Sequence, residues 1–143
     1  MIERTEVRFN VYNKTDSVIS SNNFIPFDVV DFNVGDLCNI STYKYTFLVA
    51  GTYIIGERNS KNEANGEVQI RLERDGIMRI ITRVHNTNGL LNNTIISCLV
   101  YKFIVGDVLY CYTAISTGNI KMNNTTYTTN DIYNSFWGIR LDY

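Results

Sequence analysis

Histidine, nucleophilic and acidic side chains are the groups through which this chain could do chemistry. Its single histidine, His85, ends a run of alternating apolar residues and precedes Asn86. No Gly-x-Ser-x-Gly or His-Glu-x-x-His sequence accompanies it, so neither a serine hydrolase triad nor a zinc hydrolase site is indicated. No spacing of carboxylates predicts the facing pair that glycoside hydrolysis requires. We therefore expect a protein without enzymatic activity and without catalytic residues.

Three aspartates, Asp28, Asp31 and Asp36, lie around a predicted turn and are the candidates for binding a metal. A calcium loop places its oxygen ligands at closer, alternating positions than these three offer. We therefore prefer the interpretation that they cap turns and strand ends. Bound calcium is the alternative, and no other cofactor is expected.

The chain has three cysteines, Cys38, Cys98 and Cys111, with no Cys-x-x-Cys spacing. An odd number of cysteines without such spacing indicates neither a disulfide framework nor a zinc site. We expect all three to be buried thiols.

The charge balance excludes two classes of partner. Its 13 basic residues are dispersed among 14 acidic ones, whereas nucleic acids and anionic membranes attract concentrated basic patches. No run reaches the roughly 18 apolar residues of a membrane helix, so membrane insertion is not expected. The first residues, MIERTEVRF, lack the apolar core of a signal peptide. Export or display is thus expected to depend on a leader and stalk outside this segment, or on a larger particle.

The elements that must position these residues are strands. Residues 67–73 alternate strictly between apolar and charged or polar types, and Asp75-Gly76 then turns the chain into residues 77–85, which predicts a hairpin. About ten such segments and no helical period predict one all-β domain over residues 1–143, a sandwich or barrel of the jelly-roll kind. The predicted loops are residues 59–66, 86–93 and 116–134.

Three predicted strands are apolar on both faces, which is unusual in a two-sheet sandwich. They span residues 51–55, 95–104 and 136–141. A strand whose outer face met only water would carry polar residues there. Because the sequence offers no helix as a cover, a second copy of the same sheet is the expected cover. The alternative is that these are hydrophobic strands with some exposed apolar surface.

The segment from Phe27 resembles the signature of the C1q globular-head domain, a branch of the tumour necrosis factor-like jelly rolls. Phe27, Asn33, Gly51 and Tyr53 match that pattern with its spacing intact. Further matches lie in VAGTY from Val49, in Gly106-Asp107 and in Phe136-Trp-Gly138 with Leu141, so the resemblance spans residues 7–143. Four positions depart from it: Cys38, Tyr45, Ile55 and Glu57. Of these only Glu57 loses apolar character, which suggests that this strand leaves the core early.

The resemblance implies a ten-stranded jelly-roll sandwich of the C1q/TNF-like type that assembles as a homotrimer, with one sheet face looking across the threefold axis. The residues expected toward the axis are Ile54, Gly56, Ile96, Cys98, Val100, Phe136 and Gly138, together with the polar Arg140 and Asp142. The residues expected in the core of each protomer are Tyr53, Ile55, Leu99, Tyr101, Phe103, Trp137, Ile139 and Leu141.

The resemblance also implies a function. We expect a trimeric recognition head that is extracellular or displayed on a cell, spore or virion surface and binds a protein or glycan receptor through its loops. Tyr127 and Tyr133 are the candidate ligand-binding residues. The alternative is a structural trimerisation module that caps a collagen-like or fibrous partner. Some heads of this family hold calcium, so Asp28, Asp31 and Asp36 remain the candidate calcium ligands under the alternative interpretation.

Overall fold

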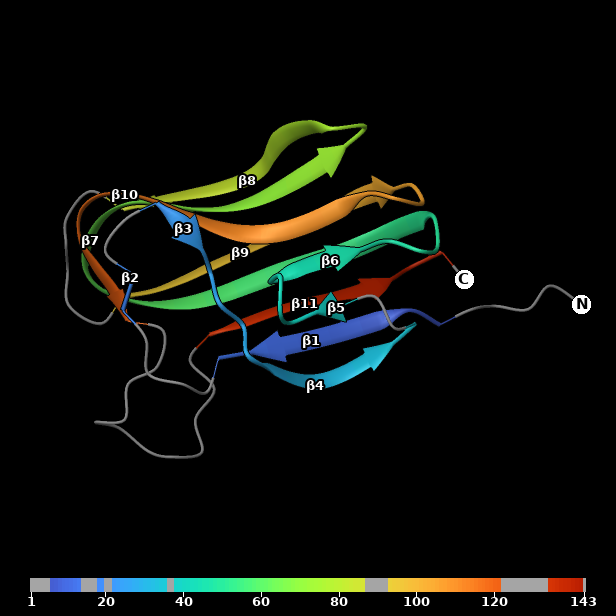
Figure 1. Ribbon diagram of the computed structural model, residues 1–143, viewed down its shortest axis with the longest axis horizontal. Coiled ribbons are helices and arrows are strands. Elements are labelled where there is room, and N and C mark those ends of the chain that lie inside the picture. The colour runs from blue at the N-terminus through green and yellow to red at the C-terminus, as the bar shows by residue number, and fades with distance from the viewer. Residues whose placement is uncertain are drawn as a thin grey trace, which may run out of the picture.

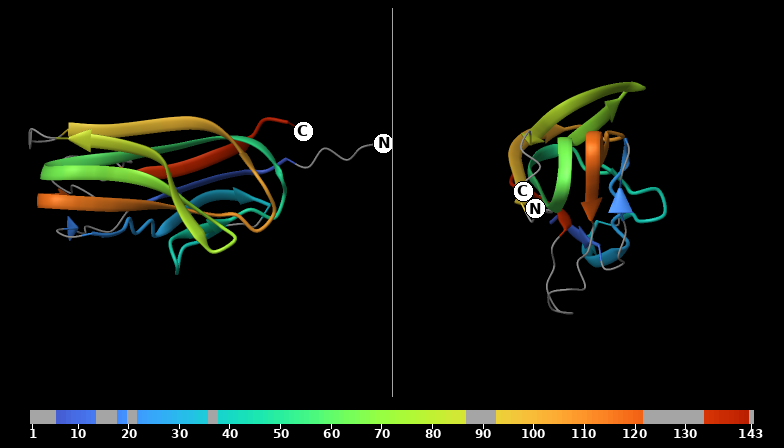
Figure 2. Two further views of the ribbon diagram at one scale, coloured as in Figure 1. Left: turned by 90° about the horizontal axis from the view of Figure 1, so that it is seen from above. Right: turned by 90° about the vertical axis from the view of Figure 1, so that its left-hand side faces the viewer.

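The computed structural model describes residues 6–13, 18–19, 22–35, 38–86, 93–121 and 134–142. These residues form eleven strands, of which the longer ones run along the long axis of the molecule (Figure 1). All their pairings are antiparallel. Two sheets curve around a shared core (Figure 2). The predicted all-β sandwich is confirmed, with three strands of only two residues bringing the count above the expected ten.

The first sheet has the strand order β4-β1-β11-β7-β9. Its members are β4 (Val29–Val34), β1 (Arg8–Tyr12), β11 (Ser135–Arg140), the first part of β7 (Gly51–Arg74) and β9 (Asn93–Phe103). The second sheet has the order β8-β7-β10-β6-β5, and β2 and β3 pair with β10. Its other members are β8 (Ile77–Asn86), β10 (Val108–Lys121), β6 (Lys44–Thr46), β5 (Cys38–Asn39), β2 (Val18–Ile19) and β3 (Asn23–Phe24).

Strand β7 belongs to both sheets and joins them at one end of the molecule (left in Figure 1). Its residues 51–61 pair with β9, and residues 66–74 pair with β8. The loop predicted at residues 59–66 is therefore wrong. Backbone pairing continues through this polar stretch, and side-chain periodicity carries no signal for that.

The loop predicted at residues 116–134 also begins too early, because β10 extends to Lys121 and Ile120 pairs with Ile19 of β2. The hairpin predicted at Asp75-Gly76 is confirmed. Both residues have positive φ, 53° and 74°, as a two-residue turn matching the sheet twist requires.

The core lies between the sheets and is rich in aromatic rings. Phe47 and Phe103 stack with centroids 4.0 Å apart, and Phe9 stacks on Tyr45 at 3.8 Å. Tyr53 and Ile55, predicted as core, are fully buried, and the predicted Leu99 and Tyr101 pack against the same cluster. Each large apolar side chain buried here contributes about 1.5–3 kcal/mol.

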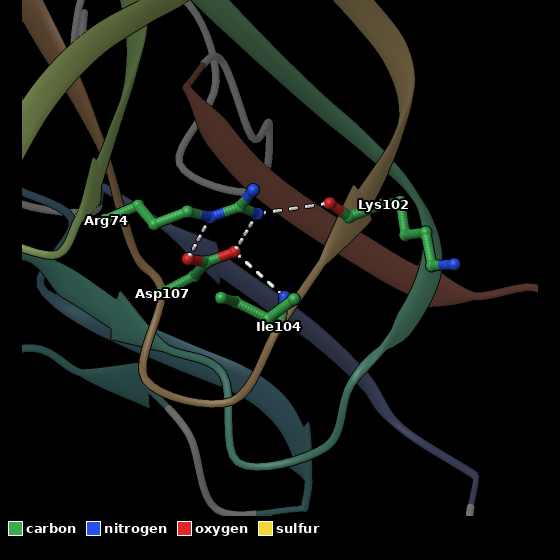
Figure 3. Close-up of polar contacts among 4 residues, drawn as sticks. All are labelled: Arg74, Lys102, Ile104 and Asp107. Atoms are coloured by element: carbon green, nitrogen blue, oxygen red, sulfur yellow. Dashed lines mark hydrogen bonds and ion pairs between the residues drawn. The ribbon is translucent and has the colours of Figure 1, made fainter.

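An ion pair fixes the turn between β9 and β10 (Figure 3). Nε and Nη2 of Arg74 bind the two carboxylate oxygens of Asp107 at 2.8 and 2.5 Å, and Nη2 also donates to the carbonyl oxygen of Lys102 at 3.3 Å. The backbone N–H of Ile104 donates to Asp107 Oδ2 at 2.9 Å. Gly106 turns the chain with φ of 92°, which favours glycine. The Gly106-Asp107 step is thus the anchored corner between these strands.

Candidate oligomer interface

The outer face of the first sheet is apolar across its centre. Register sets Ile54 of β7 between Ile139 of β11 and Val100 of β9, so these three side chains form one row. In the next row Gly56 lies between Trp137 and Cys98. The exposed fractions are 65% for Ile96, 59% for Val100 and 40% for Ile139. An exposed apolar face of this kind is typical of a surface that binds another protein.

Two residues predicted on this face lie in the core instead. Phe136 is 2% exposed and pairs with inward-facing Glu57. Gly138 pairs with Ile55, and a Cβ on it would lie 2.5 Å from the ring of Phe9. The prediction that they face the axis is wrong because a strand apolar on both faces does not reveal which face is inward.

Trp137 and Ile139, predicted in the core, lie on the outer face for the same reason. Leu141, also predicted in the core, is half exposed. Trp137 covers Gly56, where an ideal Cβ would lie 2.1 Å from Cζ2 of the indole. Only glycine at position 56 leaves room for the indole ring, so this contact explains why a glycine lies opposite Trp137. The remaining predicted axial residues, Ile54, Ile96, Cys98 and Val100, do face outward.

A shallow groove of about 350 Å³ lies on this face, between β4 and β7. Its walls are aromatic and apolar, and the guanidinium of Arg58 is its cation. The lining residues are Phe9, Asn10, Phe32, Arg58, Ser135, Trp137 and Ile139. The groove can accept an apolar side chain that carries an acceptor for Arg58.

Arg140 and Asp142 do not lie on the outer face as predicted. Arg140 pairs with inward-facing Tyr53 at the end of the sheet, and its Nε binds Asp142 Oδ1 at 3.2 Å. Asp142 also accepts the backbone N–H of Thr52 at 2.8 Å, and this bond lowers the pKa of its carboxyl. A Cβ on Gly51 would lie 2.5 Å from both side chains, so Gly51 makes space for this pair.

The cysteine prediction holds for one of the two thiols that the structure describes. Cys111 is buried and Cys98 is exposed on the outer face, and neither of these two described cysteines forms a disulfide. The side chain of Cys38 lies outside the described residues. The expectation that β7 leaves the core at Glu57 is wrong, because Glu57 is fully buried.

The other candidate site residues do not come together. His85 lies on the second sheet with its Nδ1 3.7 Å from Glu67 Oε1, and Asp31 accepts a hydrogen bond from Asn10 at 3.1 Å. Asp36, Tyr127 and Tyr133 lie outside the described residues. Within the described part of the chain, no three His, Cys, Asp or Glu side chains gather as metal ligands, and no helix could cross a membrane.

Comparison with known proteins identifies the fold. No protein-family model and no curated protein sequence matches the chain. Among solved structures, the globular domain of zebrafish complement 1qA superposes with a TM-score of 0.71 at 16% identity, covering 96% of this chain and 98% of that one. Murine APRIL at pH 5.0 gives 0.72 at 9% identity, with 95% and 99% covered. Eiger TNF from S. frugiperda gives 0.64 at 12% identity, with 96% and 94% covered.

These identities are low, so the matches carry information on architecture alone, over nearly the full length of each chain. They confirm the resemblance predicted from the sequence. The chain therefore has the C1q/TNF-like jelly-roll fold.

Proposed function

We propose that this domain is a non-enzymatic recognition head that assembles as a homotrimer and binds a protein or glycan through its loops. The observation that carries the proposal is the apolar outer face of the first sheet, which contains the exposed Ile96 and Val100. A second copy of the chain is the partner that this face fits, and the C1q/TNF-like fold supports the number three. The proposed interface residues are Ile54, Gly56, Ile96, Cys98, Val100, Trp137 and Ile139.

Light scattering coupled to size exclusion tests the assembly. We expect a mass near three times the 16.4 kDa of one chain. Ile96→Asp or Val100→Asp places a charge in the proposed interface and is expected to give monomers, because an unpaired buried charge costs several kcal/mol. Ile40→Asp is the matched control, since Ile40 is exposed in the turn between β5 and β6 of the other sheet. A wild-type monomer at micromolar concentration would contradict the proposal.

Ligand binding is assigned to the loops because a rigid sandwich can present variable loops without loss of its core. Tyr127 and Tyr133 are the proposed contacts, and three copies would add avidity. Such a head would work outside the cell or on the surface of a cell, spore or virion.

A glycan array and a receptor pull-down with the intact trimer test the binding role. Replacing residues 122–133 with a Gly/Ser linker is expected to abolish capture while light scattering still gives the trimer. Unchanged capture would exclude this loop as the binding surface. A trimer that captures nothing, but joins a collagen-like or fibrous stem, would identify the alternative structural capping module.

A further inference from the structure

Glu57 is a carboxyl group enclosed between the two sheets. It is 0% exposed and faces inward from β7, while its neighbours Gly56 and Arg58 face the other side. Its cross-strand partners are Phe136 on β11 and Ser97 on β9. Ionised carboxyl groups are rarely buried to this degree unless a cation accompanies them.

Among the described residues, the hydrogen bonds to Glu57 come from neutral groups. Ser97 Oγ donates to Oε1 at 2.9 Å, and Asn59 Nδ2 donates to Oε2 at 3.0 Å. The thiol of Cys111 on β10 is a third partner. Thr82 on β8 continues this network, with its Oγ1 3.3 Å from Ser97 Oγ. Glu57 therefore connects strands of both sheets through uncharged donors.

No cation compensates the carboxyl among the residues that the structure describes. None of their ion pairs includes Glu57. The described groups that face it are Asn59 from β7 itself, Ser97 from β9, Cys111 from β10, Thr82 from β8 by way of Ser97, and Phe136 from β11. Among these described groups Cys111 is the titratable one. Burial raises the pKa of Glu57, and the bonds from Cys111, Ser97 and Asn59 oppose that rise only in part.

We propose that Glu57 is a proton-controlled contact between the sheets: the closed sandwich holds the neutral carboxylic acid, and ionisation at higher pH leaves an uncompensated charge between the sheets and destabilises their packing. The folded chain then binds a proton that the unfolded chain has released, so stability falls as pH rises. The contribution of Glu57 is fully present below its unfolded pKa of about 4.5 and is lost as pH rises through its higher folded value. Glu57 thus contributes more to stability at acidic pH than at neutral pH.

Urea unfolding of the wild type and of Glu57→Gln across about pH 4.5 to 8.5, at one fixed protein concentration, tests this inference. Gln keeps the shape and cannot ionise. We expect the unfolding constant of the wild type to rise relative to that of E57Q by up to about tenfold per pH unit in the interval between the two pKa values. Glu73→Gln, on the outer face of the same strand, is the matched control and is expected to retain the wild-type pH dependence.

Parallel pH curves for the wild type and E57Q would overturn the inference. Should E57Q fail to fold, the titration of the Glu57 side-chain carbon by 13C NMR in the wild type gives a second measurement. We expect the midpoint of this titration to lie above the unfolded pKa of about 4.5. A midpoint at or below that value would equally overturn the inference.

Discussion

Two buried carboxyl groups, Asp107 and Glu57, are handled by this fold in opposite ways. Asp107 is 1% exposed and binds Arg74 through two N–H···O bonds, with a third bond from the backbone N–H of Ile104. Glu57 is 0% exposed, and its donors within the described part of the chain are neutral. One carboxylate is compensated by a cation, and the other is compensated by a proton.

The difference follows from position. Asp107 lies at a corner of the sandwich, where the side chain of Arg74 reaches it while remaining 24% exposed, so the guanidinium keeps part of its hydration. Glu57 lies within the sheet, where a Lys or Arg partner would have to be buried entirely, at a desolvation cost of several kcal/mol. The rim of this sandwich thus holds an ion pair, whereas our inference assigns the neutral acid to its middle.

The largest expected effect comes from removing the cation. Arg74→Leu leaves Asp107 buried and unpaired, so we expect the free energy of unfolding to fall by about 3 kcal/mol at neutral pH. Urea unfolding measures the change. Arg79→Leu, on the exposed β8 edge, is the control and should change stability by less than about 0.5 kcal/mol. Equal losses in the two variants would show that the Arg74–Asp107 pair contributes no more to stability than an exposed arginine.

A smaller loss is expected when the carboxylate itself is neutralised. Asp107→Asn removes the charge but keeps an oxygen that can accept from the N–H of Ile104, so we expect a loss of about 2 kcal/mol in the same assay. Because Glu57 is intact in this variant, the fall in stability with rising pH should persist. If the stability of D107N did not change with pH, the pH dependence would belong to Asp107 and not to Glu57.

The smallest effect concerns a neutral donor. Ser97→Ala removes one hydrogen bond to Glu57, and we expect a loss of about 1 kcal/mol at acidic pH. That bond lowers the pKa of Glu57, so its removal should move the 13C NMR midpoint of Glu57 upward. A downward movement would mean that Ser97 does not act as a donor to the ionised carboxylate.

Strand β11 shows that alternation predicts the buried face of a strand only when the two faces differ in polarity. Residues 68, 70 and 72 alternate with polar residues, and the structure buries them as the pattern predicts. Residues 136–139 are apolar or glycine at every position, so the pattern does not decide which of them point into the core. Packing decided it: the space beside Phe9 and Ile55 admits only a glycine at 138, and the space over Gly56 is taken by Trp137.

The sequence by itself determined the fold class, the Asp75-Gly76 turn and the resemblance to C1q/TNF-like jelly rolls, because turn chemistry, alternation and motif spacing can be read along the chain. The inward direction of Tyr53 and Ile55 was implied by that resemblance and is confirmed by their burial. Only the tertiary structure decided the direction of Phe136 and Gly138, the continuation of β7 through polar residues, and the burial of Glu57. Those features depend on backbone pairing and on side chains far apart in the chain. No local pattern records which neutral donors will surround a carboxyl group in the middle of a sandwich.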